Sequence, residues 1–460
     1  MKTAQKTIVG EIDPAVLAFT AGRDRIADGE LVEADCIGSA AHVTMLSELN
    51  LDTPVLTASD RDRIVERLVG IMKSKRAGKF KIAARDQDVH LAVERWLVRD
   101  LGELGRRVHA ARSRNDQAAT DLRLYAKVQL LDLREETAEL ALCLLSLASR
   151  HARTPMVGRT HMQPAMPSSV GLWASAYAES LLDDLALLDT VYRLNNRCPL
   201  GSAAGYGVAL PIRRRRTAAL LDFERPVRNV IHAGHTRGKC ESVILSACLQ
   251  VMLTLSRFAE DVILFTAPEF GYFELPAGFA TGSSIMPQKR NPDVPELIRG
   301  RTARVQGALV AVQTLLKALP MGYNRDLQET KEPLLEGLRT VRDCVRVLRP
   351  MIKGMKVNRA RLEDAFSPSV FATDEALGQV AAGKAFRDAY DAVKANLDAV
   401  REDEHRGSAL DRFAPGGPAD PDLAGMKTDA KEVRRTARAQ RRVFHRRVSS
   451  LLGVRYPDLD

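Results

Sequence analysis

The chain has 460 residues, of which 45% are hydrophobic and 27% are charged, a composition that excludes a disordered protein. Its length exceeds that of one ordinary domain and allows a large buried core. The net charge of +10 fits a nucleic-acid partner and fits an anionic small-molecule substrate equally well.

The cysteine pattern and the N-terminus bear on the compartment. The six cysteines are scattered and form no CxxC pair, which is typical of reduced, buried thiols in the cytosol. The N-terminus has no apolar signal region, and no stretch approaches the ~18 uncharged apolar residues of a membrane span. We therefore expect a cytoplasmic protein with no membrane partner.

Positive charge is concentrated in two places. Residues 427–460 contain ten Lys/Arg against four Asp/Glu, and residues 213–216 are four consecutive arginines. No aromatic residues alternate with these cations in the manner of single-strand binding, and no zinc-finger spacing occurs. We interpret the basic C-terminal segment as a solvated helix face and expect no nucleic-acid partner.

The first part of the chain, residues 1–110, reads as an N-terminal domain of short helices. The stretch 19–25 is polar and is expected to be irregular. Apolar residues then recur at helical spacing over 34–49 and again over 64–71. Ser59 or Asp60 is the expected cap of the second of these helices.

The middle of the chain, residues 111–365, predicts a bundle of long helices. Leucine and alanine recur every three to five residues over five runs, which loops containing glycine and proline separate. Pro295 and Pro333 lie near the starts of two runs, where a helix tolerates proline. The apolar positions extend beyond one narrow stripe, so we expect the bundle to bury further surface against copies of itself. The fold class is therefore all-α, with an up-down bundle and a helical C-terminal domain at 366–460 that ends in a basic helix at 428–452. The five runs are 118–153, 172–195, 241–265, 295–319 and 329–348.

Four polar loops separate these helices, and each contains a cation or an amide. Together they are suited to bind a multiply charged anion. Antiparallel neighbours place their loops at opposite ends of a bundle, so one chain alone is not expected to gather all four. A site completed across a subunit interface resolves this difficulty. The loops are 112–117, 158–163, 281–293 and 323–331.

The loop at 281–293 has the composition of a mobile catalytic segment. Gly282 precedes Ser283, and Lys289 and Asn291 follow between two prolines. The chain has no GxSxG elbow, which argues against a serine hydrolase. A serine without a triad can instead remove a proton from carbon, with Lys289 and Asn291 stabilising the carbanion. An ordinary polar linker is the alternative reading of this loop.

Metal and nucleotide sites have weaker support. His232 and His235 are three residues apart, and His161 has no acidic neighbour at ligand spacing. The glycine-rich stretch 201–207 lacks the GxGxxG or Walker spacing and predicts a tight turn between helices. We expect no metal.

The loops carry a family resemblance. GSSIMPQKRNPD at 282–293 resembles the signature of the fumarase/aspartase superfamily. ARSRNDQ at 111–117, GRTHMQ at 158–163, PLG at 199–201 and YNRDLQETK at 323–331 resemble the argininosuccinate lyase branch of it. The resemblance extends from about Phe19 to Tyr390. It implies a homotetramer with active sites built from three subunits, and reversible β-elimination of argininosuccinate to arginine and fumarate without a metal or organic cofactor.

The resemblance also implies roles for individual residues. Ser283 would be the base, with Lys289 and Asn291 stabilising the carbanion. His161, polarised by Glu296, would assist the acid, which the chemistry requires because a guanidine leaves poorly unless it is protonated. The substrate-binding residues would be Ser113, Arg114, Asn115 and Thr160 at the succinyl carboxylates, Tyr323, Gln328 and Lys331 at the arginine end, His90 in the pocket wall, and Arg237 as a retained cation.

Three departures from the family pattern concern specificity. Residues 229–239 read NVIHAGHTRGK where many relatives resemble NSxDAxSxRDF, so Arg237 is kept and the aspartates are lost. Gln87 occupies a position that is commonly acidic, and the C-terminal tail is unusually basic. One alternative is therefore a lyase acting on another N-substituted aspartate with the same fumarate product. A second alternative is a non-catalytic structural homologue of the crystallin kind.

Overall fold

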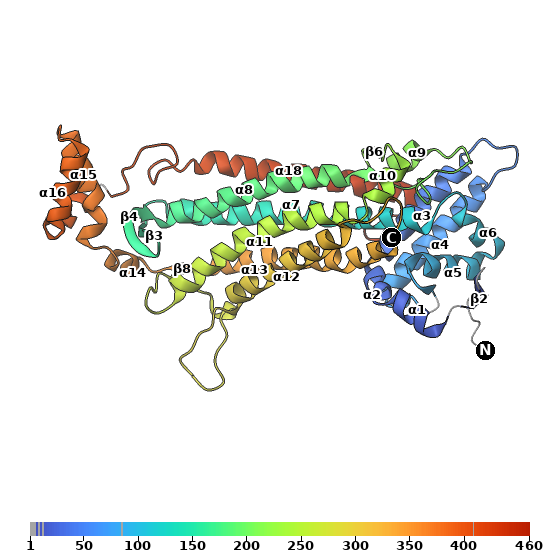
Figure 1. Cartoon of the computed structure of the whole chain (residues 1–460), viewed down its shortest axis with the longest axis horizontal. Coiled ribbons are helices and arrows are strands. Elements are labelled where there is room, and N and C mark those ends of the chain that lie inside the picture. Colours follow the sequence, from blue (N-terminus) through green and yellow to red (C-terminus); the bar gives the residue numbers. More distant parts are fainter. Residues whose placement is uncertain (1–5, 8–9, 12, 84–85, 408) are drawn as a thin grey trace.

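One helix of 37 residues, α7 (Arg114–Arg150), spans the middle of the molecule. In the computed structural model, which describes residues 1–460 apart from 1–5, 8–9, 12, 84–85 and 408, the long helices run side by side and smaller helices cover both ends (Figure 1). At 1.5 Å per residue α7 is ~55 Å long. Ser113 caps its first turn in a capping box with Asp116.

Four further long helices complete the predicted bundle. Each of the five apolar runs forms a helix within a few residues of its expected bounds, so the all-α class and the long helical bundle are confirmed. Most of their buried leucines, valines and alanines belong to one core, and Leu245, Leu309 and Val312 form a small separate cluster between α11 and α12. These helices are α8 (Val170–Asn195), α11 (Lys239–Thr266), α12 (Asp293–Leu316) and α13 (Lys331–Gly354).

The helix α11 is long and apolar enough, with a mean hydropathy of 1.5 over its most apolar window, to resemble a membrane span. It packs against α8, α12 and α13. Of its residues, Val251, Met252 and Val262 are buried in the main core. α11 is therefore interpreted as a core helix of the bundle.

The N-terminal region forms short helices around a long buried one. The stretch 19–25 was expected to be irregular, and this is wrong because most of it belongs to α1 and α2. The N-cap of α4 is Thr57, so the expectation of Ser59 or Asp60 is wrong. Asp60 takes part as the partner of Thr57 in a capping box. The elements are α1 (Pro14–Ala21), α2 (Asp24–Ala27), η1 (Asp28–Glu30), α3 (Val32–Ser47), α4 (Ala58–Arg76), α5 (Val89–Leu101), α6 (Glu103–Arg106) and η3 (Arg107–His109).

Short strands connect the helices. The longest pair is an antiparallel hairpin of β3 (Pro155–Thr160) and β4 (Gln163–Ser169), in the stretch expected to hold only a polar loop. Its turn places His161 and Met162 at φ 52° and 63°. The other pairs are β1 (Lys6–Thr7) with β2 (Gly10–Glu11), β5 (Arg197–Cys198) with β6 (Arg225–Pro226), and β7 (Phe273–Glu274) with β8 (Lys356–Val357).

The last hundred residues leave the bundle and return to it. A small separate core around Phe371 and Ala389 lies at one end of the molecule (Figure 1). Its elements are α14 (Arg359–Asp364), η6 (Pro368–Phe371), α15 (Ala372–Ala381), α16 (Phe386–Ala395), η7 (Leu397–Ala399) and α17 (Glu402–Arg406). The chain then runs back as α18 (Leu423–Leu452), which packs along α7 and α8. The division at residues 110 and 365 stays a prediction.

Part of the positive charge of the basic helix α18 is paired with acidic residues of the bundle. Arg438 lies 2.8 Å from Glu139, and Arg441 lies 2.9 Å from Asp132, both acidic residues on α7. Phe444 and Val448 lie in the main core. The six cysteines are free, and all but Cys240 are buried.

Candidate active site

The start of α7 places three predicted substrate residues together. Ser113 Oγ accepts the Asn115 backbone N–H at 3.3 Å, and Arg114 Nε donates to Asp88 at 2.7 Å. Burial acts to raise the pKa of the Asp88 carboxyl. The opposing effects of His90 and Arg114 are stronger together, so this pKa lies below its usual value. Asp88 in turn caps α5, the helix that carries His90. The cap residues of two helices thereby fix Arg114 beside His90.

A second contact brings the glycine-rich turn to the same place. The Asp116 carboxylate accepts the backbone N–H groups of Gly201 and Ala203 at 2.9 and 2.8 Å. Burial raises the pKa of Asp116 to about 6, although these N–H donors and that of Ser113 stabilise its charged form. The turn thereby forms one wall of a small cavity that Asn115, Arg237 and Tyr323 also line.

Arg237 connects this cavity to the segment around 323–331. Its Nη2 donates to the Leu327 carbonyl at 2.8 Å and lies 3.5 Å from the Gln328 side-chain oxygen. Its Nε lies 3.6 Å from Glu241, and both side chains are buried. Gln328 belongs to η5 (Arg325–Thr330), which leads directly into α13. The arginine therefore holds the predicted binding segment against the start of α11.

Lys331 is placed differently from what a free substrate-binding cation requires. Its ammonium nitrogen lies 2.7 Å from Asp28 and 3.6 Å from Asp24, and its side chain is only 2% exposed. Burial raises the pKa of Asp24, and Lys331 opposes this. In this chain Lys331 therefore anchors two N-terminal carboxylates, and a direct contact with substrate stays a prediction.

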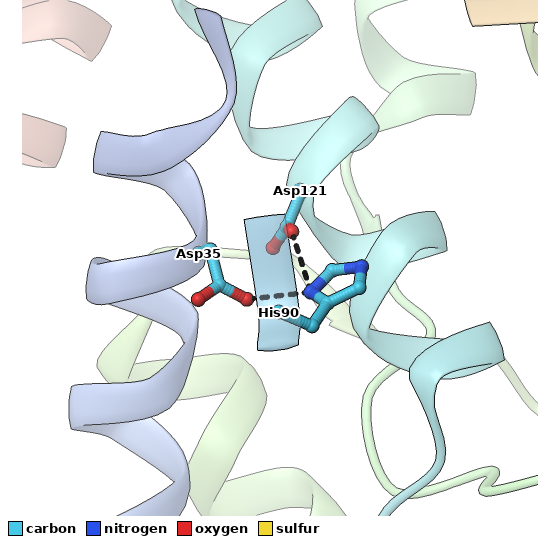
Figure 2. Close-up of side chains that lie close together, drawn as sticks. All are labelled: Asp35, His90 and Asp121. Atoms are coloured by element: carbon cyan, nitrogen blue, oxygen red, sulfur yellow. Dashed lines mark hydrogen bonds and ion pairs between the residues drawn. The ribbon is translucent and has the colours of Figure 1, made fainter. Parts of the chain in front are cut away.

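His90 is held between two aspartates (Figure 2). Its Nδ1 lies 2.8 Å from Asp35 on α3 and 3.5 Å from Asp121 on α7, and all three side chains are buried. Burial, with the nearby negative charge of Asp35 and Asp28, raises the pKa of Asp121 well above its usual value. This cluster fixes the imidazole ring through three separate helices.

The same three residues are the one group in the described part of the chain whose ligand atoms are spaced for a metal ion, within 4.8 Å of one another. Arg112 and Lys331 already supply positive charge to Asp121. Those cations disfavour a divalent ion, and we interpret the group as a hydrogen-bonded network that orients His90.

The serine loop lies elsewhere. Residues 281–292 project from the bundle between α11 and α12 (Figure 1). The backbones of Thr281 and Asn291 pair at its base, with hydrogen bonds of 3.1 and 2.8 Å. Ser283 Oγ accepts the N–H groups of Ile285 and Met286 at 3.3 and 3.1 Å. Lys289 is exposed, as is Glu296 in the first turn of α12.

Thr160 and His161 form a third location. Both are exposed at the tip of the β3–β4 hairpin, which follows the C-terminus of α7. No hydrogen bond or ion pair joins His161 to Glu296 among the residues that the structure describes. The hairpin and the start of α7 lie at opposite ends of the bundle (Figure 1), ~55 Å apart along that helix.

The predicted residues therefore form three groups within one chain. The start-of-α7 group contains His90, Ser113, Arg114, Asn115, Arg237, Tyr323, Gln328 and Lys331. The serine-loop group contains Ser283, Lys289, Asn291 and Glu296. The hairpin group contains Thr160 and His161. The chain does not bring these groups together by itself.

Sequence reasoning missed the acidic partners in the first group. Asp28, Asp35, Asp88 and Asp121 each contact a predicted site residue. The available signal was a carboxylate at a helix position expected to be buried, since Asp35 and Asp121 lie on the buried faces of α3 and α7.

Comparison with known proteins supports one family. Residues 8–307 match a protein family described as lyase. An argininosuccinate lyase of Parabacteroides distasonis is 41% identical over 85% of this chain and 86% of its own length. An argininosuccinate lyase of Sorangium cellulosum is also 41% identical, over 90% of this chain and 96% of its own length.

Solved structures share the fold at lower identity. A variant of an EDDS lyase with bound fumarate superposes with a TM-score of 0.73 at 24% identity, covering 96% of this chain and 94% of that one. A class II fumarase of Schistosoma mansoni gives a TM-score of 0.69 at 16% identity, covering 88% of this chain and 97% of the fumarase chain. The fold, the motifs and the sequence relatives agree, and the chain belongs to the argininosuccinate lyase family.

Proposed function

We propose that this protein is an argininosuccinate lyase that catalyses the reversible β-elimination of argininosuccinate to L-arginine and fumarate. One observation carries the proposal: the residues that the family resemblance assigns to this reaction lie in three separate places within one chain. Such a distribution has a use only if several copies of the chain meet at each site. No metal or organic cofactor enters this proposal.

Ser283 is the base in this proposal. It removes a proton from the carbon adjacent to the one that carries the departing nitrogen, and the carboxylate bonded to that first carbon delocalises the resulting charge until the carbon–nitrogen bond breaks and the double bond of fumarate forms. Two backbone N–H groups donate to Ser283 Oγ, at 3.3 and 3.1 Å, which favours the alkoxide form that a base requires. Lys289 and Asn291, from the same loop, stabilise the developing negative charge.

The acid side uses the hairpin. His161 lies exposed at a fixed turn and would reach a site on another subunit, where Glu296 of a further copy polarises it. The acid protonates the departing guanidine, because the neutral group leaves far more readily than its anion. Thr160, beside His161, would join Ser113, Arg114 and Asn115 at the succinyl carboxylates.

The start-of-α7 group would hold the other end of the substrate. Tyr323 and Gln328 face the arginine portion, together with the cation Arg237. Lys331 supports this end by anchoring Asp24 and Asp28, whose carboxylates match a guanidinium in charge.

The proposal includes self-association as a homotetramer, and the outer face of α12 supports it. Leu297 and Val310 on this face are 56% and 53% exposed. A Cβ at Gly300 or Gly307 would meet open space, so a second helix has room to approach the backbone closely. We expect Val310→Arg to reduce the mass measured by light scattering to that of a smaller species; an unchanged mass would remove this surface from the interface.

The alternatives concern substrate and activity. A lyase acting on another N-substituted aspartate shares the same base and product, and the departures at 229–239 favour keeping it open. A non-catalytic, crystallin-like homologue is disfavoured because Ser283, His161, Lys289 and Glu296 are all present. We also propose a cytoplasmic location, without a nucleic-acid or membrane partner.

The deciding experiment follows fumarate absorbance when the purified protein is incubated with argininosuccinate. Steady fumarate release, with arginine in equal amount, is the expected result. Fumarate from a different N-substituted aspartate, but none from argininosuccinate, would reject the substrate and keep the chemistry. No fumarate from any such substrate would favour the non-catalytic alternative.

A further inference from the structure

A cavity of about 330 Å³ lies on the outer side of the turn between α10 (Val230–His235) and α11. The end of α8, the short β5–β6 pair and the start of α11 form its walls, and α7 contributes one side chain. Figure 1 places α10 and β6 at the same end of the molecule. None of its lining residues belongs to the three groups of the candidate active site.

All the ionisable side chains of acid–base type that line the cavity, apart from the thiol of Cys240, are basic. No aspartate or glutamate lines the cavity. Among the described residues, the one ion pair between a lining cation and a carboxylate joins Arg225 to Glu224. Its 3.8 Å separation is near the limit for an ion pair. The wall also contains His232 and apolar side chains such as Leu194 and Val243. The five permanent cations are Arg123, Arg197, Arg225, Arg228 and Lys239.

One of these cations is fixed in place. Arg123 is only 5% exposed, and its Nη1 donates to the carbonyl oxygens of Asn195 and Arg197, at 3.0 Å each. Its Nε and Nη2 make no hydrogen bond within the described residues. The Arg197 Nε is buried and also has no described partner. Donors with no protein acceptor therefore remain at the cavity.

The cations oppose one another. Burial lowers the pKa of Arg197, and the nearby positive charges of Arg225, Arg123 and Arg228 lower it further. Burial, followed by Lys239 and Arg123, lowers the pKa of His232. Like charges held together at this density are destabilising, and a bound anion would relieve that cost.

Three of the lining residues, His232, Thr236 and Lys239, belong to the segment that departs from the family pattern, and two of them change the charge of the wall. In NSxDAxSxRDF the fourth position is an aspartate, and here it is His232. The eleventh position is a phenylalanine, and here it is Lys239. The first change removes a negative charge from the wall, and the second adds a positive one. The same departure that leaves Arg237 in place thus makes the neighbouring cavity basic.

We propose that this cavity binds a small multivalent anion, one carrying at least two carboxylate or phosphate groups. Its volume is at the lower end of the range for small-molecule sites, which favours a compact ligand over a polymer. A larger cleft of about 1280 Å³ between α4, α9 (Arg214–Leu220) and α18 also contains arginines. There Glu48, Asp62 and Glu66 lie among the cations, so that cleft is the weaker anion site.

The test measures binding of citrate and of inorganic pyrophosphate to the full-length protein by isothermal titration calorimetry. The informative variant is Arg228→Gln/Lys239→Gln, because both side chains line the cavity and neither belongs to the candidate active site. The matched control is Lys431→Gln/Arg442→Gln, which removes the same charge from exposed positions of α18. A midpoint of thermal unfolding equal to that of the unchanged protein would verify that both variants fold.

We expect at least one probe to bind saturably, with one site per chain. Each lost cation should weaken binding by about tenfold, and the control should bind as the unchanged protein does. Preference for citrate identifies a carboxylate ligand, and preference for pyrophosphate a phosphate ligand. The proposal fails if neither probe binds, if both double variants weaken binding equally, or if the cavity variant binds normally. These outcomes do not depend on which aspartate derivative the enzyme cleaves.

Discussion

Lys331 and Asp28 form a buried ion pair, with 2.7 Å between the ammonium nitrogen and the nearer carboxylate oxygen, and with side chains 2% and 0% exposed. Asp28 also accepts the backbone N–H of Val89 at the start of α5. One carboxylate therefore joins the start of α13 to two separate parts of the N-terminal region.

Removing one partner of this pair should destabilise the protein. Lys331→Met leaves the Asp28 charge buried without compensation, at a cost of about 3–5 kcal/mol. We expect a lower midpoint of thermal unfolding. Asp28→Asn/Lys331→Met should recover part of the loss, and the exposed Lys317→Met should change little. A Lys331→Met protein with normal stability and a raised KM would indicate that Lys331 contacts substrate instead.

Ser283→Ala should abolish most turnover. Loss of a positioned general base lowers kcat by roughly 10²–10⁴-fold. The fold should persist, because Ser283 lies on a projecting loop and its hydroxyl hydrogen-bonds, within the described residues, to the backbone of that loop alone. The exposed neighbour Ser284 gives a matched control, and Ser284→Ala should keep its activity. Near-normal activity of Ser283→Ala would reject the base assignment.

Mixing two inactive variants should restore activity. Ser283 and His161 belong to groups that lie apart within one chain, so exchange of subunits between Ser283→Ala and His161→Asn proteins creates some sites with neither change. Fumarate release from the mixture should exceed that of either variant alone. A mixture of Ser283→Ala with Lys289→Met should stay inactive, because both residues lie on one loop. Absence of recovery after demonstrated exchange would contradict shared sites.

His42 should make stability depend on pH. It is fully buried, its Nε2 lies 2.8 Å from the Ala110 carbonyl, and burial lowers its pKa to about 3. Below the unfolded value of about 6.5, the unfolded chain binds a proton that the native chain does not, so stability falls as the pH decreases.

The slope should be up to about 1.4 kcal/mol per pH unit between these two values. His42→Gln should flatten the fall in thermal midpoint between neutral pH and pH 5, and His235→Gln, at an exposed position, should not. Equal slopes in all three proteins would show that other groups set the acid sensitivity.

The long helices were predictable because their signal is repeated. α7 carries a buried leucine or alanine on nearly every turn, and a pattern of that length outweighs local exceptions. The candidate residues of the serine loop could also be predicted from the sequence, since their types alone suggest proton removal. The positions of those residues relative to the other candidate site residues could not be predicted, because they depend on how the helices pack.

The hairpin and the buried aspartates escaped prediction for physical reasons. His161 and Met162 adopt positive φ without glycine or asparagine, the usual signal of such a turn. Asp35 and Asp121 are two of several buried polar residues on α3 and α7, and only the packing of α3, α5 and α7 shows that both meet His90.

The return of α18 to α7 has a consequence for biosynthesis. Phe444 completes the core beside Lys127, whose ammonium lies 5.2 Å from the ring centre, yet about 300 residues separate the two in the chain. A ribosome therefore releases α7 long before the helix that covers it exists. The acidic and apolar surface of α7 that α18 covers therefore stays exposed until the final residues emerge. A stop codon before α18 would leave this surface exposed permanently.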